Sequence, residues 1–337
     1  MDGLAIKPSK PNNRRMLVCL DGSPHSELSM PYAVSLAAAF GCTITLVHVL
    51  DPHRSHSGPQ SSDVLAWEIS RQTAQTYLDR VHAELERSLG TQVDRRLDQG
   101  RPADRIVDVA REISADFTVV GCGLRAETTR VLGSTAQQVL ALGRSSVLVV
   151  HPSPGSPTLA TPRRLLVPLD GSVRAESVLP TASRIAKMHD AEVVLVHVVQ
   201  EAVSSTLIQR AGCFLLVQQL AEILHGAATQ YLDELKQQLQ HDVRVVRTLV
   251  ARHPNPRQRL LELAASEKTD LIVLSAHGTT CDSGQPFGCV AAHIIAHSTV
   301  ATLVIQDLPQ RSSTPPPKHD SMLSSPTLRA SFAAESR

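Results

Sequence analysis

The chain has 337 residues, of which 42% are hydrophobic and 3% aromatic, with a formal net charge of +1. This length suffices for two domains of ordinary size. So few aromatic residues exclude a stacking platform for single-stranded nucleic acid, and the 33 basic and 32 acidic residues create no field that attracts DNA or an anionic membrane. We therefore expect neither nucleic acid nor a membrane as a partner.

The N-terminus has no apolar run of signal-peptide length, and no apolar stretch reaches the ~18 residues of a membrane span. A cytoplasmic location is therefore expected. The six cysteines lack C-x-x-C spacing, which predicts reduced and mostly buried thiols rather than a disulfide framework. They are Cys19, Cys42, Cys122, Cys213, Cys281 and Cys289.

The sequence contains an internal repeat. Leu20-Asp21-Gly22-Ser23 returns 149 residues later as Leu169-Asp170-Gly171-Ser172. The other matching pairs are Pro31 and Pro180, His48 and His197, Asp116 and Asp270, and Gly133 and Gly288. One module has therefore been duplicated, with a few additional residues in the second copy.

Each copy alternates short apolar runs with longer amphipathic stretches, as in βαβ units around a parallel sheet. The predicted strands are 15–20, 43–49, 92–97, 116–121 and 146–150, then 163–168, 192–199, 243–249, 270–275 and 301–305. The longest predicted helices are 61–89 and 206–240. The predicted fold class is α/β, with two tandem doubly wound domains. Each has a five-stranded parallel sheet in the order 3-2-1-4-5, with helices on both faces and ligands at the carboxyl ends of the first and fourth strands.

Composition marks the domain boundaries. We predict domains at 14–151 and 163–307, separated by a linker at 152–162 that is rich in Pro, Ser and Gly. The tail, 308–337, is rich in Ser and Pro and has little periodicity, so it is predicted to be disordered.

Asp21 and Asp170 each follow an apolar strand and precede Gly-Ser. An acidic residue at this edge can hold a ribose hydroxyl or a phosphate-bound metal, and the glycine permits a sharp turn. Alternatively, Asp-Gly-Ser is only a turn with a helix cap.

A glycine-rich loop follows the fourth strand of the first copy, with Gly121, Gly123 and then Gly133-Ser134. Glycines permit close approach of the backbone to a ligand, and Gly133-Ser134 opens a helix whose N-terminus suits a phosphate.

LVPLDGS, the proline in the first helix, LVHV and the glycine loop give both copies a resemblance to the universal stress protein family over residues 14–307. The adenine-nucleotide motif of that family is G-x2-G-x9-G-[ST]. The resemblance implies an ATP-binding stress-response regulator, with Mg²⁺ accompanying the nucleotide. It also implies pairing of the two copies through their last strands, a possible homodimer, and a loop at 51–62 that borders the ligand cleft. The nucleotide-binding residues implied are Leu20, Asp21, Val49, Gly121, Gly123, Gly133 and Ser134, with Leu169, Asp170, Val198, Gly278 and Gly288 in the second copy.

Both loops depart from the family motif. The first copy has one residue fewer between its first two glycines, whereas the second has Ser275 for the first glycine and Cys289 for the closing serine. Arg125 and Arg130 lie in the first loop, but the second loop has no cation, so electrostatics favours the first copy if only one site binds ATP. Occupancy of both copies, or of neither, is the alternative.

Histidines raise two further possibilities. The first is a zinc site, because positions 289, 293 and 297 share a helix face in a cluster of His277, Cys281, Cys289, His293 and His297; their overall spacing matches no common zinc pattern, and no metal site is predicted. The second is catalysis by His48 or His197, for which a core histidine with satisfied ring nitrogens is the alternative.

No motif for an activated nucleophile or paired acid and base occurs, so we expect a protein that is not an enzyme. A nucleotide-free interaction scaffold and a slow ATP hydrolase of the adenine-nucleotide α-hydrolase group are the alternatives.

Overall fold

A computed structural model describes residues 14–52, 64–89, 93–122, 124–125, 129–130, 133–151, 161–201, 214–279 and 287–306. The loop predicted to border the cleft at 51–62, the linker at 152–162 and the tail at 308–337 lie mostly or entirely outside these residues.

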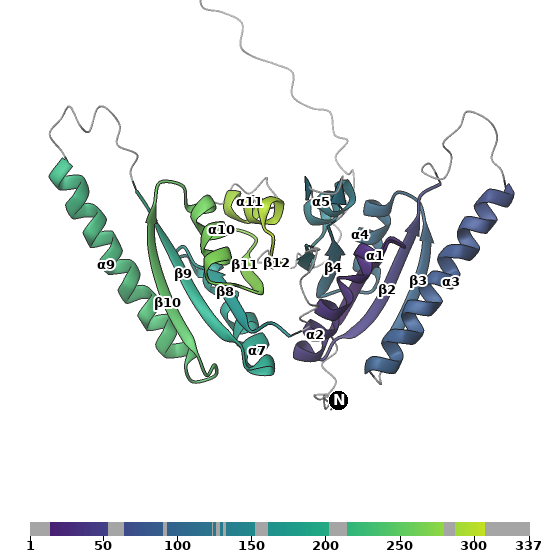
Figure 1. Ribbon diagram of the computed structural model, residues 1–337, viewed down its shortest axis with the longest axis horizontal. Helices are drawn as coiled ribbons and strands as arrows, with labels where there is room; N and C mark the ends of the chain where they lie inside the picture. The colour runs from purple at the N-terminus through teal and green to yellow at the C-terminus, as the bar shows by residue number, and fades with distance from the viewer. Residues whose placement is uncertain are drawn as a thin grey trace, which may run out of the picture. The chain divides into compact units, whose positions relative to one another are not determined.

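The first repeat alternates strands with helices, as the apolar periodicity predicts (Figure 1). Its strands are β1 Arg15–Leu20, β2 Thr43–Leu50, β3 Val93–Gln99, β4 Phe117–Gly121, β5 Leu124–Arg125, β6 Thr129–Arg130 and β7 Ser146–Val150. Its helices are α1 Pro24–Glu27, α2 Met30–Phe40, α3 Val64–Leu89, α4 Pro102–Glu112 and α5 Ser134–Leu142.

The second repeat has the same order of main elements. Its strands are β8 Arg164–Pro168, β9 Glu192–Gln200, β10 Val246–His253, β11 Leu271–Ser275 and β12 Ala301–Ile305. Its described helices are α6 Val173–Glu176, α7 Leu179–His189, α9 Phe214–Leu239, α10 Pro256–Ser266 and α11 Cys289–His297.

The main strands form one sheet in the order β10-β9-β8-β11-β12-β7-β4-β1-β2-β3. Within each repeat the strands are parallel and their order is 3-2-1-4-5, which confirms the predicted fold class. The repeats meet where β12 pairs antiparallel with β7, Leu303 lying opposite Leu148. The duplicated halves therefore share a continuous sheet.

One strand lies later in the chain than predicted. The sequence predicts 243–249 for the strand that occupies Val246–His253. The N–H groups of Asp242 and Val243 donate to the carbonyl of Leu239, so these residues belong to the turn that ends α9. The strand then continues to His253 because its whole length pairs with β9. The small antiparallel hairpin of β5 and β6 was not predicted either.

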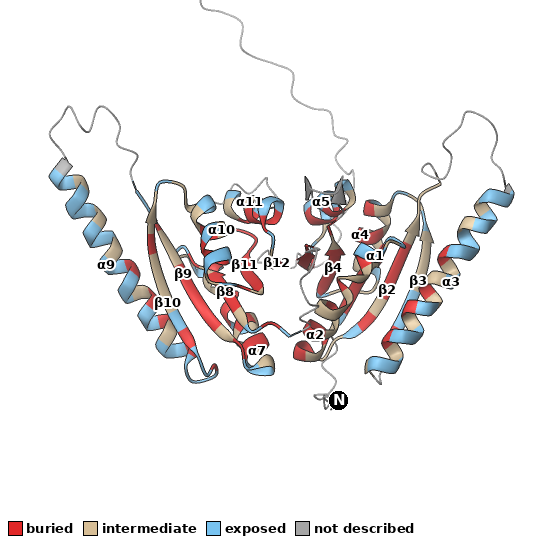
Figure 2. Ribbon diagram, in the orientation of Figure 1, coloured by how far each residue is buried: buried red, intermediate tan, exposed pale blue. Residues whose placement is uncertain are grey.

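Helices cover both faces of the sheet, so most strand residues are buried on both sides (Figure 2). Val18 faces the core under α2, α3, α7 and α9, whereas Leu17 faces the core under α4, α5, α10 and α11. Both cores run through the two repeats. This double burial explains the apolar, aromatic-poor strands.

A second contact between the repeats joins α2 to α7. The Nε2 atom of His189 lies 2.8 Å from Oγ of Ser35. Arg184 donates from Nε to the carbonyl of Ala39 at 2.7 Å, and its guanidinium lies 5.1 Å from the centre of the Phe40 ring. Polar and cation–π contacts therefore reinforce the pairing of β7 with β12.

Within the residues described, no helix has both the length and the apolar character that a membrane crossing requires.

Candidate functional site

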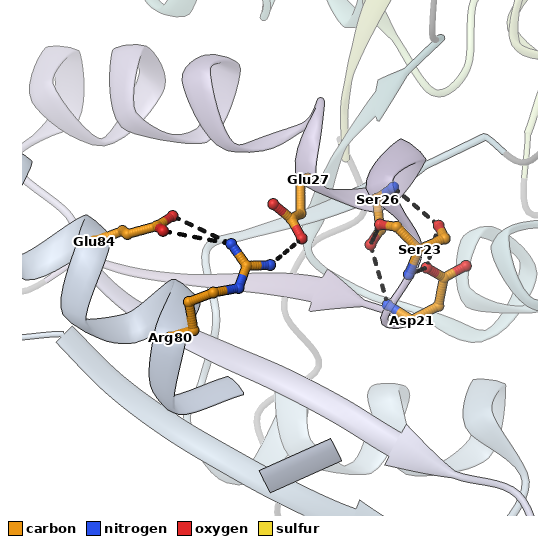
Figure 3. Close-up of polar contacts among 6 residues, drawn as sticks. All are labelled: Asp21, Ser23, Ser26, Glu27, Arg80 and Glu84. Atoms are coloured by element: carbon orange, nitrogen blue, oxygen red, sulfur yellow. Dashed lines mark hydrogen bonds and ion pairs between the residues drawn. The ribbon is translucent and has the colours of Figure 1, made fainter. Parts of the chain in front are cut away.

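The Asp-Gly-Ser segments form matching turns at the carboxyl ends of β1 and β8. Gly22 and Gly171 have φ angles of +82° and +83°, which a side chain would disfavour. Ser23 caps α1 by accepting from the N–H of Ser26, and its own N–H and Oγ donate to Oδ1 of Asp21 at 2.9 and 2.6 Å (Figure 3). The alternative of a turn with a helix cap therefore describes the local structure.

Ion pairs hold this turn against the long helix of the first repeat. Arg80 in α3 donates to Glu27 in α1 at 2.6 Å and also contacts Glu84 (Figure 3). Glu27 is the last residue of α1, the short helix that follows the Asp21 turn. The ion pair with Arg80 therefore ties α3 to the segment that leaves the end of β1.

Asp170 makes a contact in the second repeat that reaches a distant loop. Its Oδ1 accepts from the N–H and Oγ of Ser172 at 3.0 and 2.6 Å, and its Oδ2 accepts from the N–H of Thr279 at 2.7 Å. Burial raises the pKa of Asp170, but these hydrogen bonds outweigh it and hold the pKa below its ordinary value. Asp170 is therefore ionised and joins the loop after β8 to the loop after β11 through hydrogen bonds.

The backbone of Gly278 packs closely against the Asp170 carboxylate. A Cβ atom at this position would lie 2.1 Å from Oδ2 of Asp170, closer than any real contact. The backbone of the glycine loop and the carboxylate of the strand-one turn therefore meet, as expected for neighbouring strands that end at one edge.

A cleft of about 830 Å³ opens at this edge of the second repeat. Its lining includes the predicted residues Leu169, Asp170, Val198, Gly278 and Gly288, together with His197 and Cys289. The cleft lies where β8 and β11, neighbours in the sheet, lead into helices on opposite faces. The structure thus gathers the second-repeat residues predicted to bind a nucleotide.

The glycines that precede α5 and α11 leave both helix N-termini without a side-chain cap. Gly133 and Gly288 are the N-cap residues, and neither cap position makes a side-chain hydrogen bond. A Cβ at Gly288 would meet only ordinary contacts at 3.5 Å or more, and one at Gly133 would meet nothing within 4 Å. No described residue therefore requires glycine at these two positions.

The predicted residues of the first repeat are described in part. Leu20 ends β1 and is buried, Val49 lies in β2, Gly121 ends β4, and Ser134 begins α5. Gly123 lies outside the described residues. Of Arg125 and Arg130, the structure describes only the backbone, paired in the hairpin of β5 and β6. The predicted preference for the first copy stays a prediction.

Sequence reasoning missed one cation of the second-repeat cleft. Arg257, in the first turn of α10, lines the cleft together with the N-cap Asn255. The loop motif does not contain Arg257, because it follows a different strand. Its place in the sequence, in the first turn of the helix that follows β10, could have indicated it, since the carboxyl ends of parallel strands share one edge.

His48 and His197 lie on β2 and β9 beside a tyrosine of the long helix in each repeat. The ring centres of His48 and Tyr77 are 5.9 Å apart, and those of His197 and Tyr231 are 6.3 Å apart. Burial lowers the pKa of both histidines, although a hydrogen bond to the backbone of Leu20 or Leu169 opposes it. The Nδ1 atom of each ring is buried and has no hydrogen-bond partner among the described residues, which differs from the expectation of fully satisfied nitrogens.

The histidines at the end of α11 contact each other. The rings of His293 and His297 stack with their centres 4.2 Å apart, and Nδ1 of His297 lies 2.9 Å from the carbonyl of His293. Among the described residues, no three His, Cys, Asp or Glu side chains gather as a metal site would require. Cys281 lies outside those residues.

Comparison with known proteins identifies the family. The sequence model of the universal stress protein family matches the chain twice, over residues 12–151 and 161–306. The chain belongs to the universal stress protein family. Both repeats of this universal stress protein are therefore family domains, which confirms the resemblance inferred from the sequence.

Relatives match either one repeat or both. A universal stress protein from Mycolicibacterium smegmatis is 26% identical over 307 residues, which cover 86% of this chain and 96% of the relative. One from Thermus aquaticus is 32% identical over 141 residues, covering 41% of this chain and 98% of the relative. The crystal structure of a universal stress protein from Archaeoglobus fulgidus, 18% identical, has a TM-score of 0.61 and covers 87% of this chain and 98% of that one. This structural similarity supports the tandem fold.

Proposed function

We propose that this universal stress protein binds an adenine nucleotide and acts as a regulator in the stress response. The observation that carries the proposal is the cleft of about 830 Å³ in the second repeat, where Asp170, two glycines and the start of α11 converge. Its volume lies within the range of small-molecule sites, and its place at the carboxyl edge of the sheet is where doubly wound folds bind ligands.

The chemistry of the cleft fits the parts of a nucleotide. The uncapped first turn of α11 offers N–H groups to a phosphate, and Arg257 adds a positive charge at the rim. Apolar side chains, including Val198 and Leu260, offer a surface for a purine ring. The buried Nδ1 of His197 has no hydrogen-bond partner in the part of the chain that the structure describes, and it would accept from or donate to a ligand or a water.

ATP with Mg²⁺ is the form of nucleotide that we propose. Among the described residues that line the cleft, Asp170 supplies the carboxylate. It would contact a phosphate-bound Mg²⁺ or a ribose hydroxyl. The metal would supply neutralisation of the phosphate charge.

We propose binding without efficient turnover. Both oxygens of Asp170 already accept hydrogen bonds, and its lowered pKa makes it a weak general base. The proposal therefore assigns the nucleotide a regulatory role, in which occupancy changes the loops joined by Asp170 and Thr279.

The proposal places the protein in the cytoplasm and treats the paired repeats as an intramolecular dimer. Cys19, Cys42, Cys122 and Cys289 are free thiols, which agrees with a reducing compartment. The antiparallel pairing of β7 with β12 supports the intramolecular dimer.

The test combines identification of released nucleotide with calorimetric titration of the nucleotide-free protein. Freshly purified protein is denatured and the supernatant is analysed by chromatography, and Mg-ATP is then titrated into wild type, Gly133→Val and Gly288→Val. These two glycines are matched, because each is the N-cap of a loop helix without a side-chain cap and an added Cβ at either would clash with no described residue.

Each outcome assigns the site. Loss of binding in Gly288→Val places the nucleotide in the second repeat, whereas loss in Gly133→Val places it in the first, as the loop charges predict. If the wild type neither releases a nucleotide nor binds Mg-ATP, the proposed function is wrong and a nucleotide-free scaffold replaces it.

A further inference from the structure

Most residues in the N-terminal half of α9 are exposed (Figure 2), and several of them are large and apolar. Leu215, Leu216, Leu220, Ile223 and Leu224 are 69%, 65%, 55%, 67% and 44% exposed. Monomeric proteins seldom leave large apolar side chains gathered in this way, and such patches mark interaction surfaces. We call these five residues the α9 patch.

Helix α9 has two apolar faces, and the sheet covers one of them. The covered face consists of Val217, Ala221, His225, Ala228 and Leu232, of which Ala228 and Leu232 are buried. The other face consists of Leu216, Leu220, Ile223 and Ala227, all exposed. Their spacing of four, three and four residues is that of the a and d positions of a coiled coil. The uncovered face therefore has the pattern of a helix-pairing seam.

The corresponding helix of the first repeat has fewer large apolar residues on the equivalent face. Tyr77 and Tyr231 occupy equivalent positions, which sets an offset of 154 residues between α3 and α9. At that offset Leu220 corresponds to Ala66 and Leu224 to Ser70. Ile69, the counterpart of Ile223, is also 58% exposed, so the second repeat is set apart by its leucines at positions 216, 220 and 224.

The area of the α9 patch is close to what a specific interface needs. From the exposed fractions, the five side chains leave roughly 500 Å² of surface in water, at the upper end of the largest patches on monomers. Leu215 and Leu224 lie on opposite sides of the helix, so one partner cannot cover all five. The seam residues Leu216, Leu220 and Ile223 of two copies would together bury roughly 700 Å², so flanking residues must complete the total of about 1,000 Å² that a specific interface needs.

The charges around the α9 patch favour a second copy over other partners. Glu222 is the single charged residue between positions 215 and 227, and Arg252 contacts its carboxylate at 2.8 Å. Two such faces can approach without like-charge repulsion. The absence of Lys and Arg from this stretch disfavours an anionic membrane, which basic amphipathic helices prefer.

We propose that two copies of this chain associate through their α9 helices, with Leu216, Leu220 and Ile223 of each copy packing on the other. The same patch is used on both copies, so the contact closes on a two-fold axis and forms a dimer. The inference does not depend on the proposed nucleotide binding.

The test measures the oligomeric state of the full chain by sedimentation equilibrium over a range of concentrations. At the same offset Leu216 corresponds to Ser62, so the double variant Leu216→Ser, Leu220→Ala installs first-repeat residues in the proposed contact and should weaken the dimer at least about tenfold. A matched control is Leu65→Ala, since Leu65 is 67% exposed on α3 and lies outside the α9 patch. It should leave the dimer unchanged. Circular dichroism and the melting temperature check that both variants fold.

A wild-type chain that stays monomeric overturns the inference, as does a dimer that the double variant leaves intact. A monomeric wild type that instead sediments with phosphatidylcholine and phosphatidylglycerol vesicles, and loses this in the double variant, would assign the α9 patch to a lipid surface and equally overturn it.

Discussion

The N–H of Thr279 donates to Oδ2 of Asp170 at 2.7 Å, although 109 residues separate them in the chain. This hydrogen bond joins the turn after β8 to the loop after β11. Because both segments line the cleft, the shape of the site depends on it.

Gly278→Ala should disrupt this contact. Its Cβ would lie 2.1 Å from Oδ2 of Asp170, so the loop must move away, and we expect unfolding free energy to fall by about 1–3 kcal/mol together with loss of nucleotide binding. Urea denaturation measures the first effect and calorimetry the second. Gly288→Ala, whose Cβ meets ordinary contacts, is the control and should change stability by less than about 0.5 kcal/mol. Equal losses of unfolding free energy in the two variants would contradict the prediction.

Arg257→Gln should weaken ATP binding in the second repeat. The guanidinium lines the cleft and would pair with phosphate, so we expect about a tenfold loss of affinity for Mg-ATP and a smaller loss for adenosine. Arg259→Gln is the matched control, because Arg259 lies on the same helix but pairs with Glu262. The role of Arg257 is disproved if ATP and adenosine lose affinity equally.

Cys289 should be alkylated before the other described thiols. Burial raises the pKa of Cys19, Cys42 and Cys122 to about 12 each, so at neutral pH they hold almost no thiolate, whereas Cys289 is exposed in the cleft. Peptide mapping by mass spectrometry after iodoacetamide treatment should find Cys289 modified at least about tenfold faster. Mg-ATP should slow that modification if the nucleotide occupies the second repeat, and an unchanged rate under saturating Mg-ATP would argue for the first.

Acid should weaken the contribution of His189 to stability. Burial lowers its pKa below the ordinary value, and the hydrogen bond to the backbone of Ser35 only partly opposes this. As pH falls below about 6.5, the unfolded chain takes up a proton that the folded chain resists, so stability decreases through this window.

The measurement compares wild type with His189→Gln, whose amide can still reach Ser35. The stability difference between the two proteins should shift in favour of the variant as pH falls from about 7.5 to about 5.5. His48 and His197 titrate in both proteins, so their effects cancel. A difference that stays constant with pH would rule out this role for His189.

The order of elements could be read from the sequence because strands buried on both faces must be continuously apolar. LVCL in β1 and VVLVHVV in β9 follow that rule, and the repeated Leu-Asp-Gly-Ser placed each strand-one turn. The positive φ angles of Gly22 and Gly171 are local as well, so residue type alone indicated them. Family membership followed from the same local motifs.

Tertiary structure decided what depends on segments far apart in the chain. Arg257 reaches the cleft because β10 and β8 end at the same sheet edge, and Gly278 is restricted because Asp170 lies against it. No local pattern records such distances. Likewise, the sequence does not show whether a sheet covers an apolar residue of a helix. Leu232 is buried and Leu220 is exposed because α9 packs on β9 and β10 along only one of its faces.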